Sequence, residues 1–241
     1  MISNYFGINI LTFPFGFIIS IIFFFGIAQT NKIVLKKFQK NQISLGTTIL
    51  IPFIIFSFFI AFVNIFLYVN VTFVKYFIYL IFILSLFLSY QFITNLQFNK
   101  ILKIKFKKDF VSIFLILFIF SYFIISSFPL SDSDSLAYHS SFGAFMIKFD
   151  NATWLKNIHL SHGDFLLSGY TEIVNFIGLV LLIDNLGSYV NFFTLFYIFF
   201  CLKKLFYKNK SIDLVFLFII STPILLPMIF SQKIYILPCF I

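Results

Sequence analysis

Charged residues are scarce in this chain of 241 residues, and their scarcity excludes most classes of protein. Asp, Glu, Lys and Arg together make up 10% of the residues, 61% are hydrophobic, and the mean hydropathy is +1.05. A soluble domain of this length could not bury so much apolar surface. The composition therefore predicts an all-α, polytopic transmembrane protein.

Cysteine is also rare in the sequence, and arginine is absent. The two cysteines, Cys201 and Cys239, both lie in apolar stretches, which argues against a disulfide framework. Every basic residue is a lysine, and the lysines cluster between apolar runs although the formal net charge is +9. Clusters of this kind are typical of orientation signals in membrane proteins, so we expect no nucleic-acid partner.

Long apolar runs are what the sequence has in abundance. A run of about 18 residues or more can cross about 30 Å of hydrocarbon as a helix. We expect about six such spans, near Leu11–Gln29, Ile43–Val69, Tyr76–Asn95, Phe110–Phe128, Leu186–Leu202 and Ile212–Phe230.

Three lysine-rich segments orient these spans. Residues 31–42, 97–109 and 203–210 hold thirteen of the lysines, which places them in the cytoplasm by the positive-inside rule. The turn at 70–75 and the long polar loop at 129–165 then face outward. The expected location is the inner membrane of a bacterium.

The segment Phe165–Ile183 complicates this count, because it is apolar enough for a helix but carries Glu172 and Asn175. A full crossing would move residues 203–210 to the outside, against the charge rule. We therefore expect a re-entrant or interfacial helix here.

Two regions are expected, with no soluble domain. Residues 1–109 form an N-terminal three-helix membrane segment, and residues 110–241 form a membrane core that contains the outer loop. Pro223 and Pro227 should kink or shorten the last run. Because Ile241 lies inside another apolar stretch, we expect the chain to be truncated at its C-terminus.

The outer loop holds the best candidates for chemistry. Asp132 and Asp134 follow the end of a predicted span, and two carboxylates two residues apart can hold a divalent cation such as Mg²⁺ or Mn²⁺. One of them could instead act as a general base. Tyr138 lies four residues after Asp134, so a helix would place them on one face with His139 adjacent. The alternative is that Asp132 only caps a helix.

Two further residues are candidates for substrate binding. Glu172 is the single glutamate of the chain, and Lys233 stands apart from the three cytoplasmic lysine clusters. An outward lysine can neutralise a lipid phosphate. The alternatives are a solvated helix face for Glu172 and an ordinary snorkelling anchor for Lys233.

The order of these features resembles the GT-C superfamily of polytopic membrane glycosyltransferases. The resemblance rests on Asp134-Ser-Leu-Ala-Tyr-His139, Gly169-Tyr-Thr-Glu172, Asn185-Leu-Gly187 and Ser231-Gln-Lys-Ile-Tyr235, and it covers roughly residues 115–241. It implies transfer of a sugar from a polyprenyl-phosphate-linked donor to a lipid, glycan or protein acceptor on the extracytoplasmic face. In this family the acidic residue of the first outer loop binds a metal or acts as base, a role that falls to Asp134 with Asp132 beside it. Members often carry an acidic residue where this chain has Tyr235.

The alternative function is a non-catalytic membrane component, such as part of a transporter or an envelope assembly partner. Transporters usually carry polar residues at mid-membrane depth. The predicted spans are nearly free of charge, which favours a site in the outer loop over a transport path.

Overall fold

The computed structural model describes residues 14–24, 26, 45–67, 69–95, 110–127, 140–149, 170–205, 211–223 and 225. Every regular element within these ranges is an α-helix, which confirms the all-α prediction. The helices are an N-terminal helix at Phe15–Phe24, α3 (Leu45–Leu67), α4 (Val71–Asn95), α6 (Phe110–Ser127), α7 (Ser140–Phe149), α8 (Tyr170–Val180), α9 (Leu186–Leu205) and α10 (Ile212–Ile220).

Local sequence explains where α4 begins and where α10 ends. Helix α4 begins five residues before the predicted span, because the Asn70 side chain caps it: the Phe73 N–H donates to Asn70 Oδ1 at 2.9 Å. Helix α10 ends at Ile220, three residues before Pro223. This ending agrees with the expectation that proline shortens the last apolar run.

Helix α7 lies inside the polar stretch 129–165, outside every expected span; the sequence offered only a short helix beginning near Asp132. Its sequence, SSFGAFMIKF, has Lys148 in the last turn, where a cation interacts favourably with the helix dipole. Ala144 and Met146 are fully buried. Gly143 lets α7 approach α8 closely, because a Cβ at this position would lie 3.0 Å from the Phe176 Cα. Packing against α8 therefore makes a helix out of a segment that the sequence pattern alone assigns to a loop.

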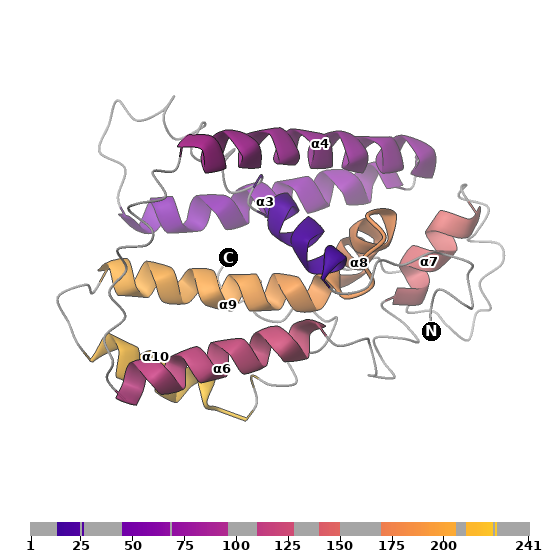
Figure 1. Ribbon diagram of the computed structural model, residues 1–241. Helices are drawn as coiled ribbons and strands as arrows, with labels where there is room; N and C mark the ends of the chain where they lie inside the picture. The colour runs from indigo at the N-terminus through magenta and orange to yellow at the C-terminus, as the bar shows by residue number, and fades with distance from the viewer. Residues whose placement is uncertain are drawn as a thin grey trace.

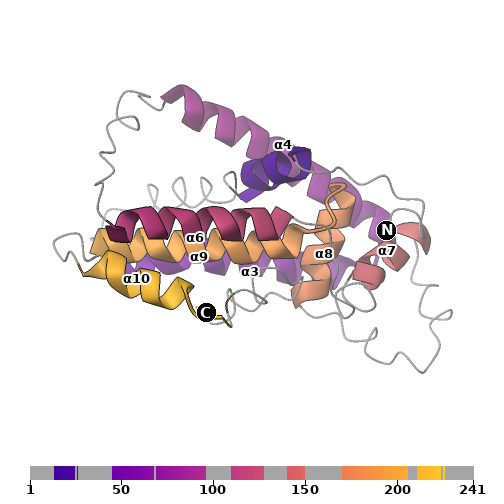
Figure 2. The same cartoon turned by 60° about the horizontal axis from the view of Figure 1, so that its bottom comes forward.

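The helix ends divide between two ends of the molecule (Figure 1). Helices α7 and α8, the turn from α3 to α4, the end of α6 and the start of α9 gather at one end, which we call the α7–α8 end. The start of α3, the end of α4, the start of α6 and the end of α9 lie at the other. The second group adjoins the three lysine-rich segments in the sequence. Figure 2 shows the same division after rotation, with α6 lying along α9.

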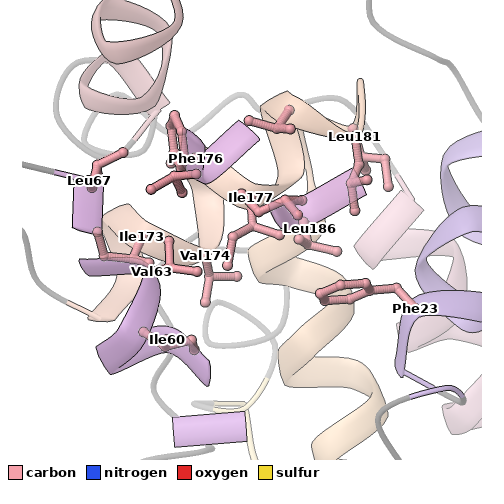
Figure 3. Packing of buried hydrophobic residues seen from close by; sticks show 14 of the residues in the cluster. Phe23, Ile60, Val63, Leu67, Ile173, Val174, Phe176, Ile177, Leu181 and Leu186 are labelled. Atoms are coloured by element: carbon pink, nitrogen blue, oxygen red, sulfur yellow. The ribbon is translucent and has the colours of Figure 1, made fainter. Parts of the chain in front are cut away.

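The larger apolar core joins α8 to α3, α4 and α9. Ile173, Val174 and Ile177 of α8 are fully buried in one cluster with Val63 of α3 and Val74 of α4. Figure 3 shows the α8 side chains beside those of α3 and Leu186. This shared cluster packs α8 against α3, α4 and α9 at the α7–α8 end of the bundle.

A second core joins α6, α9 and α10. Its buried members include Leu115, Phe192 and Phe216, and the rings of Phe199 and Phe216 stack with centroids 4.1 Å apart. The Tyr122 hydroxyl of α6 donates to the Ile220 carbonyl at the end of α10. Both cores thus use α9, which is the central helix of the described fold.

Candidate functional site at the α7–α8 end

Helix α8 is short and enclosed. Its 11 residues give a length of about 16 Å, which is too short to cross about 30 Å of hydrocarbon. Every residue from Ile173 to Val180 is buried. A helix lying on a membrane surface would leave one face exposed, so α8 is instead inserted among α3, α4, α7 and α9.

Glu172 lies in the first turn of α8, and it is half-buried. An acidic side chain is favourable there because the N-terminal turn of a helix carries partial positive charge. Thr171, next to it, is also half-buried. Glu172 is thus the only predicted site residue that lies within the described part of the chain, and it is placed where α8 meets the polar stretch.

Asn175 is the polar side chain of α8 that sequence reasoning left without a role. It is 2% exposed, and neither its Oδ1 nor its Nδ2 has a hydrogen-bond partner within the described residues. Leaving a buried polar group unpaired costs about 1–3 kcal/mol. Asn175 follows Glu172 by three residues, so both lie on the same side of α8.

A tight turn links α8 to α9. The Ile183 N–H donates to the Gly178 carbonyl at 2.8 Å and the Leu182 N–H donates to the Leu179 carbonyl at 3.0 Å, which is the pattern of a Schellman motif. Leu182 takes the left-handed position of this motif with φ of 62°, where glycine is usual. A Cβ on Gly178 would lie 2.7 Å from the Ile183 carbonyl oxygen, so this turn admits no side chain at that position.

The turn continues into a polar junction with α6. Asn185 stands at the N-cap of α9, because its carbonyl accepts from the Tyr189 N–H at 3.1 Å, and its Nδ2 donates to the Ser126 carbonyl of α6 at 2.9 Å. Burial raises the pKa of the neighbouring Asp184 carboxyl above its ordinary value, and hydrogen bonds from the backbone N–H groups of Asp184 and Asn185 oppose that shift. An acidic group, an amide and two helix ends therefore meet within a few residues.

Helix α9 carries a buried polar face that sequence reasoning missed. Ser188, Asn191 and Thr194 follow one another at intervals of three residues and are 2%, 0% and 6% exposed. Such spacing keeps them on one side of the helix. The sequence did contain a signal for this face, because three polar residues recur at intervals of three within an apolar run. The predicted spans are nearly free of charge, but the span that forms α9 carries these three buried polar side chains.

Lys75 links α4 to α7 at the same end. Its Nζ donates to the Ile147 carbonyl in the last turn of α7 at 3.2 Å. The two residues are 72 positions apart in the sequence. This bond places the first turns of α4 beside the end of α7, in agreement with Figure 1.

The remaining predicted site residues lie outside the described part of the chain: Asp132, Asp134, Tyr138, His139 and Lys233. Their convergence with Glu172, and the metal site expected at Asp132 and Asp134, stay predictions. Within the described ranges no group of three or more His, Cys, Asp or Glu residues is arranged to hold a metal ion.

Three comparisons with known proteins return no significant match: no family model, no curated protein and no solved structure matches this chain.

Proposed function

We propose that this chain is a multi-pass membrane protein that carries its functional site at the α7–α8 end. The observation that carries the proposal is the division of the helix ends, because the start of α3, the end of α4, the start of α6 and the end of α9, which adjoin the lysine-rich segments, lie opposite α7 and α8 (Figure 1). By the positive-inside rule, the lysine-rich end faces the cytoplasm and the α7–α8 end faces outward.

Exposed apolar surface supports the membrane part of the proposal. Two described helices, Val71–Tyr90 and Phe110–Ser127, are long and apolar enough to cross a membrane. Only 22% and 17% of their apolar stretches are buried inside the protein. The core helix of a soluble protein would be mostly buried, and neither helix stands at the N-terminus as a signal sequence does. Lipid is the medium that makes such surfaces favourable.

The short helix α8 supports the expected topology. If α8 enters from the outer side and returns through the Leu182 turn, α9 can cross toward the cytoplasm and deliver residues 203–210 to the inner side. Buried on all sides from Ile173 to Val180, α8 fits a re-entrant helix better than an interfacial one. Non-helical turns at membrane depth are tolerated where protein encloses them.

The activity that we propose for this site is glycosyl transfer of the GT-C type. The protein would move a sugar from a polyprenyl-phosphate-linked donor to a lipid, glycan or protein acceptor on the extracytoplasmic face. Asp134, with Asp132, would bind a divalent metal or take the acceptor's proton. Tyr138, His139 and Glu172 would contact the substrates, and Lys233 would offset phosphate charge on the departing carrier. Support comes from the resemblance of the outer loop and from the position of Glu172 at the proposed outward end.

Transfer of labelled sugar in membranes that express matched amounts of protein tests this activity. Loss of general-base action in Asp134→Asn should lower the rate by about 10²–10⁴-fold. Asp132→Asn should cost less if Asp132 caps a helix, because asparagine caps nearly as well as aspartate. Unchanged turnover in Asp134→Asn would remove the proposed role of the loop.

A second candidate is a non-catalytic membrane component that takes part in transport. The buried polar face of α9, with Asn191 and Thr194 in the middle of an apolar helix, favours it, since polar groups at that depth often mark a path through the membrane. Sugar transfer by the full-length wild-type protein decides between the two candidates in favour of the enzyme.

A further inference from the structure

Helix α8 has different surroundings on its different sides. Ile173, Val174 and Ile177 belong to the larger apolar core, as Figure 3 shows. The backbone of Phe176 lies close to α7. Successive residues of a helix are about 100° apart around its axis, so Asn175 lies on the side of α8 that faces away from the core residues.

Thr171 and Glu172 lie on the same side of α8 as Asn175. They precede it by four and three residues, which places their Cβ atoms about 5–6 Å from that of Asn175. Side chains of a helix lean toward its N-terminus, so the Asn175 amide is directed at this first turn. Thr171 and Glu172 are half-buried, whereas Asn175 is 2% exposed. A ligand at the partly open first turn would therefore meet the Asn175 amide as its inner wall.

The Asn175 amide has unused hydrogen-bonding capacity. Among the residues that the structure describes, neither its Oδ1 nor its Nδ2 has a partner. A buried polar group without a partner destabilises the fold, and an apolar side chain of similar shape would avoid that cost. Such a group in a native protein calls for an explanation. A ligand that pairs with both atoms supplies one.

The chemistry of the amide restricts the ligand. Nδ2 only donates and Oδ1 only accepts, so the ligand must offer an acceptor beside a donor. An ammonium group donates without accepting and would leave Nδ2 unpaired, and a fully ionised phosphate accepts without donating and would leave Oδ1 unpaired. Two neighbouring hydroxyl groups meet both requirements, because each hydroxyl donates and accepts.

We propose that Asn175, with Glu172 in the turn before it, forms the subsite that binds two neighbouring hydroxyls of a neutral hexose. Asn175 Nδ2 would donate to one hydroxyl oxygen, its Oδ1 would accept from the next hydroxyl, and Glu172 would accept from a third. This inference rests on the proposed sugar transfer, and it adds the class of sugar and a residue that selects it. Selection follows because a sugar that lacks one of the two hydroxyls leaves a buried atom of the amide unpaired.

Binding of defined sugar carriers to the full chain in nanodiscs tests the subsite. Isothermal titration calorimetry compares bare octaprenyl phosphate with octaprenyl phosphate that carries glucose, mannose or galactose. Two hydrogen bonds to the amide should make at least one hexose carrier bind on the order of 10- to 100-fold more tightly than the bare carrier. In Asn175→Leu this preference should fall to near one, with the affinity for the bare carrier unchanged.

Monodeoxy analogues of the preferred hexose identify the hydroxyls. Two analogues, lacking neighbouring hydroxyls, should each bind wild type about tenfold more weakly than the parent sugar. The same analogues should bind Asn175→Leu as well as the parent sugar does. An equal loss in wild type and in Asn175→Leu for every analogue would mean that Asn175 does not contact the sugar.

Stability without a carrier separates recognition from folding. The subsite requires Asn175→Leu to be at least as stable as wild type in the absence of carrier, although it binds the hexose carrier more weakly. Val174→Ala, a neighbouring change on the core side of α8, should lower stability and keep the hexose preference. A destabilised Asn175→Leu would show that the amide is satisfied within the protein, which overturns the subsite.

The remaining outcomes distinguish this inference from the proposed function. Transfer of labelled sugar by a wild type that shows no hexose preference overturns the subsite and leaves sugar transfer standing. An unchanged preference in Asn175→Leu has the same consequence. A wild type that binds none of the carriers and transfers no sugar contradicts the proposed function, and the subsite with it.

Discussion

Asn185 and Ser126 join two helices that are far apart in the sequence. The Asn185 side chain, at the start of α9, donates to the Ser126 carbonyl near the end of α6 at 2.9 Å, across 59 residues. The last carbonyls of a helix have no partner within the helix, so this one amide satisfies a group of α6 while it begins α9. The bond anchors the α8–α9 turn to the rest of the bundle.

Removal of this bond should destabilise the fold. Asn185→Ser keeps a good N-cap residue but is too short to reach the Ser126 carbonyl, so we expect a loss of about 1–3 kcal/mol for the buried acceptor left unpaired. Unfolding by denaturant in mixed micelles measures it. Ser221→Ala is the matched control, because the exposed Ser221 hydroxyl donates to the Phe218 carbonyl of α10, the helix that Ser221 follows directly. Equal effects of the two substitutions would contradict a special role for Asn185.

Replacement of two buried asparagines by leucine should change the stability of the protein in opposite directions. Asn175→Leu replaces an amide without described partners by an apolar side chain of similar shape, and it should stabilise the protein by about 1 kcal/mol or more. Asn191→Leu should destabilise it, because Asn191 is fully buried and has an interaction to lose. The unfolding temperatures of both variants and of the wild type, measured in the same detergent, test this prediction. A destabilised Asn175→Leu would mean that the amide is satisfied in the folded protein.

The turn at Leu182 stores backbone strain that glycine should relieve. At φ of 62° a side chain crowds the backbone, and Leu182→Gly should raise the free energy of unfolding by about 0.5–1 kcal/mol. Little burial is lost, because Leu182 is 38% exposed. Leu181→Gly, at a buried position beside it, should destabilise instead. The same denaturant titration distinguishes the two variants.

Asp184 should make stability depend on pH. Burial raises the pKa of Asp184 in the folded protein, so on a rise in pH the unfolded chain releases this proton first. The contribution of Asp184 is therefore fully present below the ordinary aspartate pKa and is lost as pH rises through the higher pKa of the folded state. Unfolding measured at several pH values between 3 and 7 should show a steeper decline for wild type than for Asp184→Asn. Parallel curves would contradict the burial of this carboxyl.

Cysteine labelling tests the proposed orientation. In a Cys201→Ser, Cys239→Ser background, a membrane-impermeant thiol reagent should label Val69→Cys from outside, since the α3–α4 turn is exposed at the α7–α8 end. It should not label Phe206→Cys unless the membrane is opened. External labelling of position 206 would mean that residues 165–183 cross the membrane completely.

The sequence by itself determined the helical class and most helix positions. Long apolar runs, the Asn70 cap and Pro223 are all local signals, and the starts of α6 and α9 agree with the predicted spans at Phe110 and Leu186. Local signals suffice there because the hydrogen bonds of a helix backbone are made within the helix itself, between residues four apart.

Only the tertiary structure decided what α7, α8 and the start of α9 do. Helix α7 depends on its contact with α8 at Gly143, and the burial of α8 from Ile173 to Val180 depends on α3, α4, α7 and α9. The bonds from Asn185 to Ser126 and from Lys75 to Ile147 link residues 59 and 72 positions apart. No periodicity along the chain encodes such partners, because they are selected by which helices fit together and which buried polar groups that fit leaves to be satisfied.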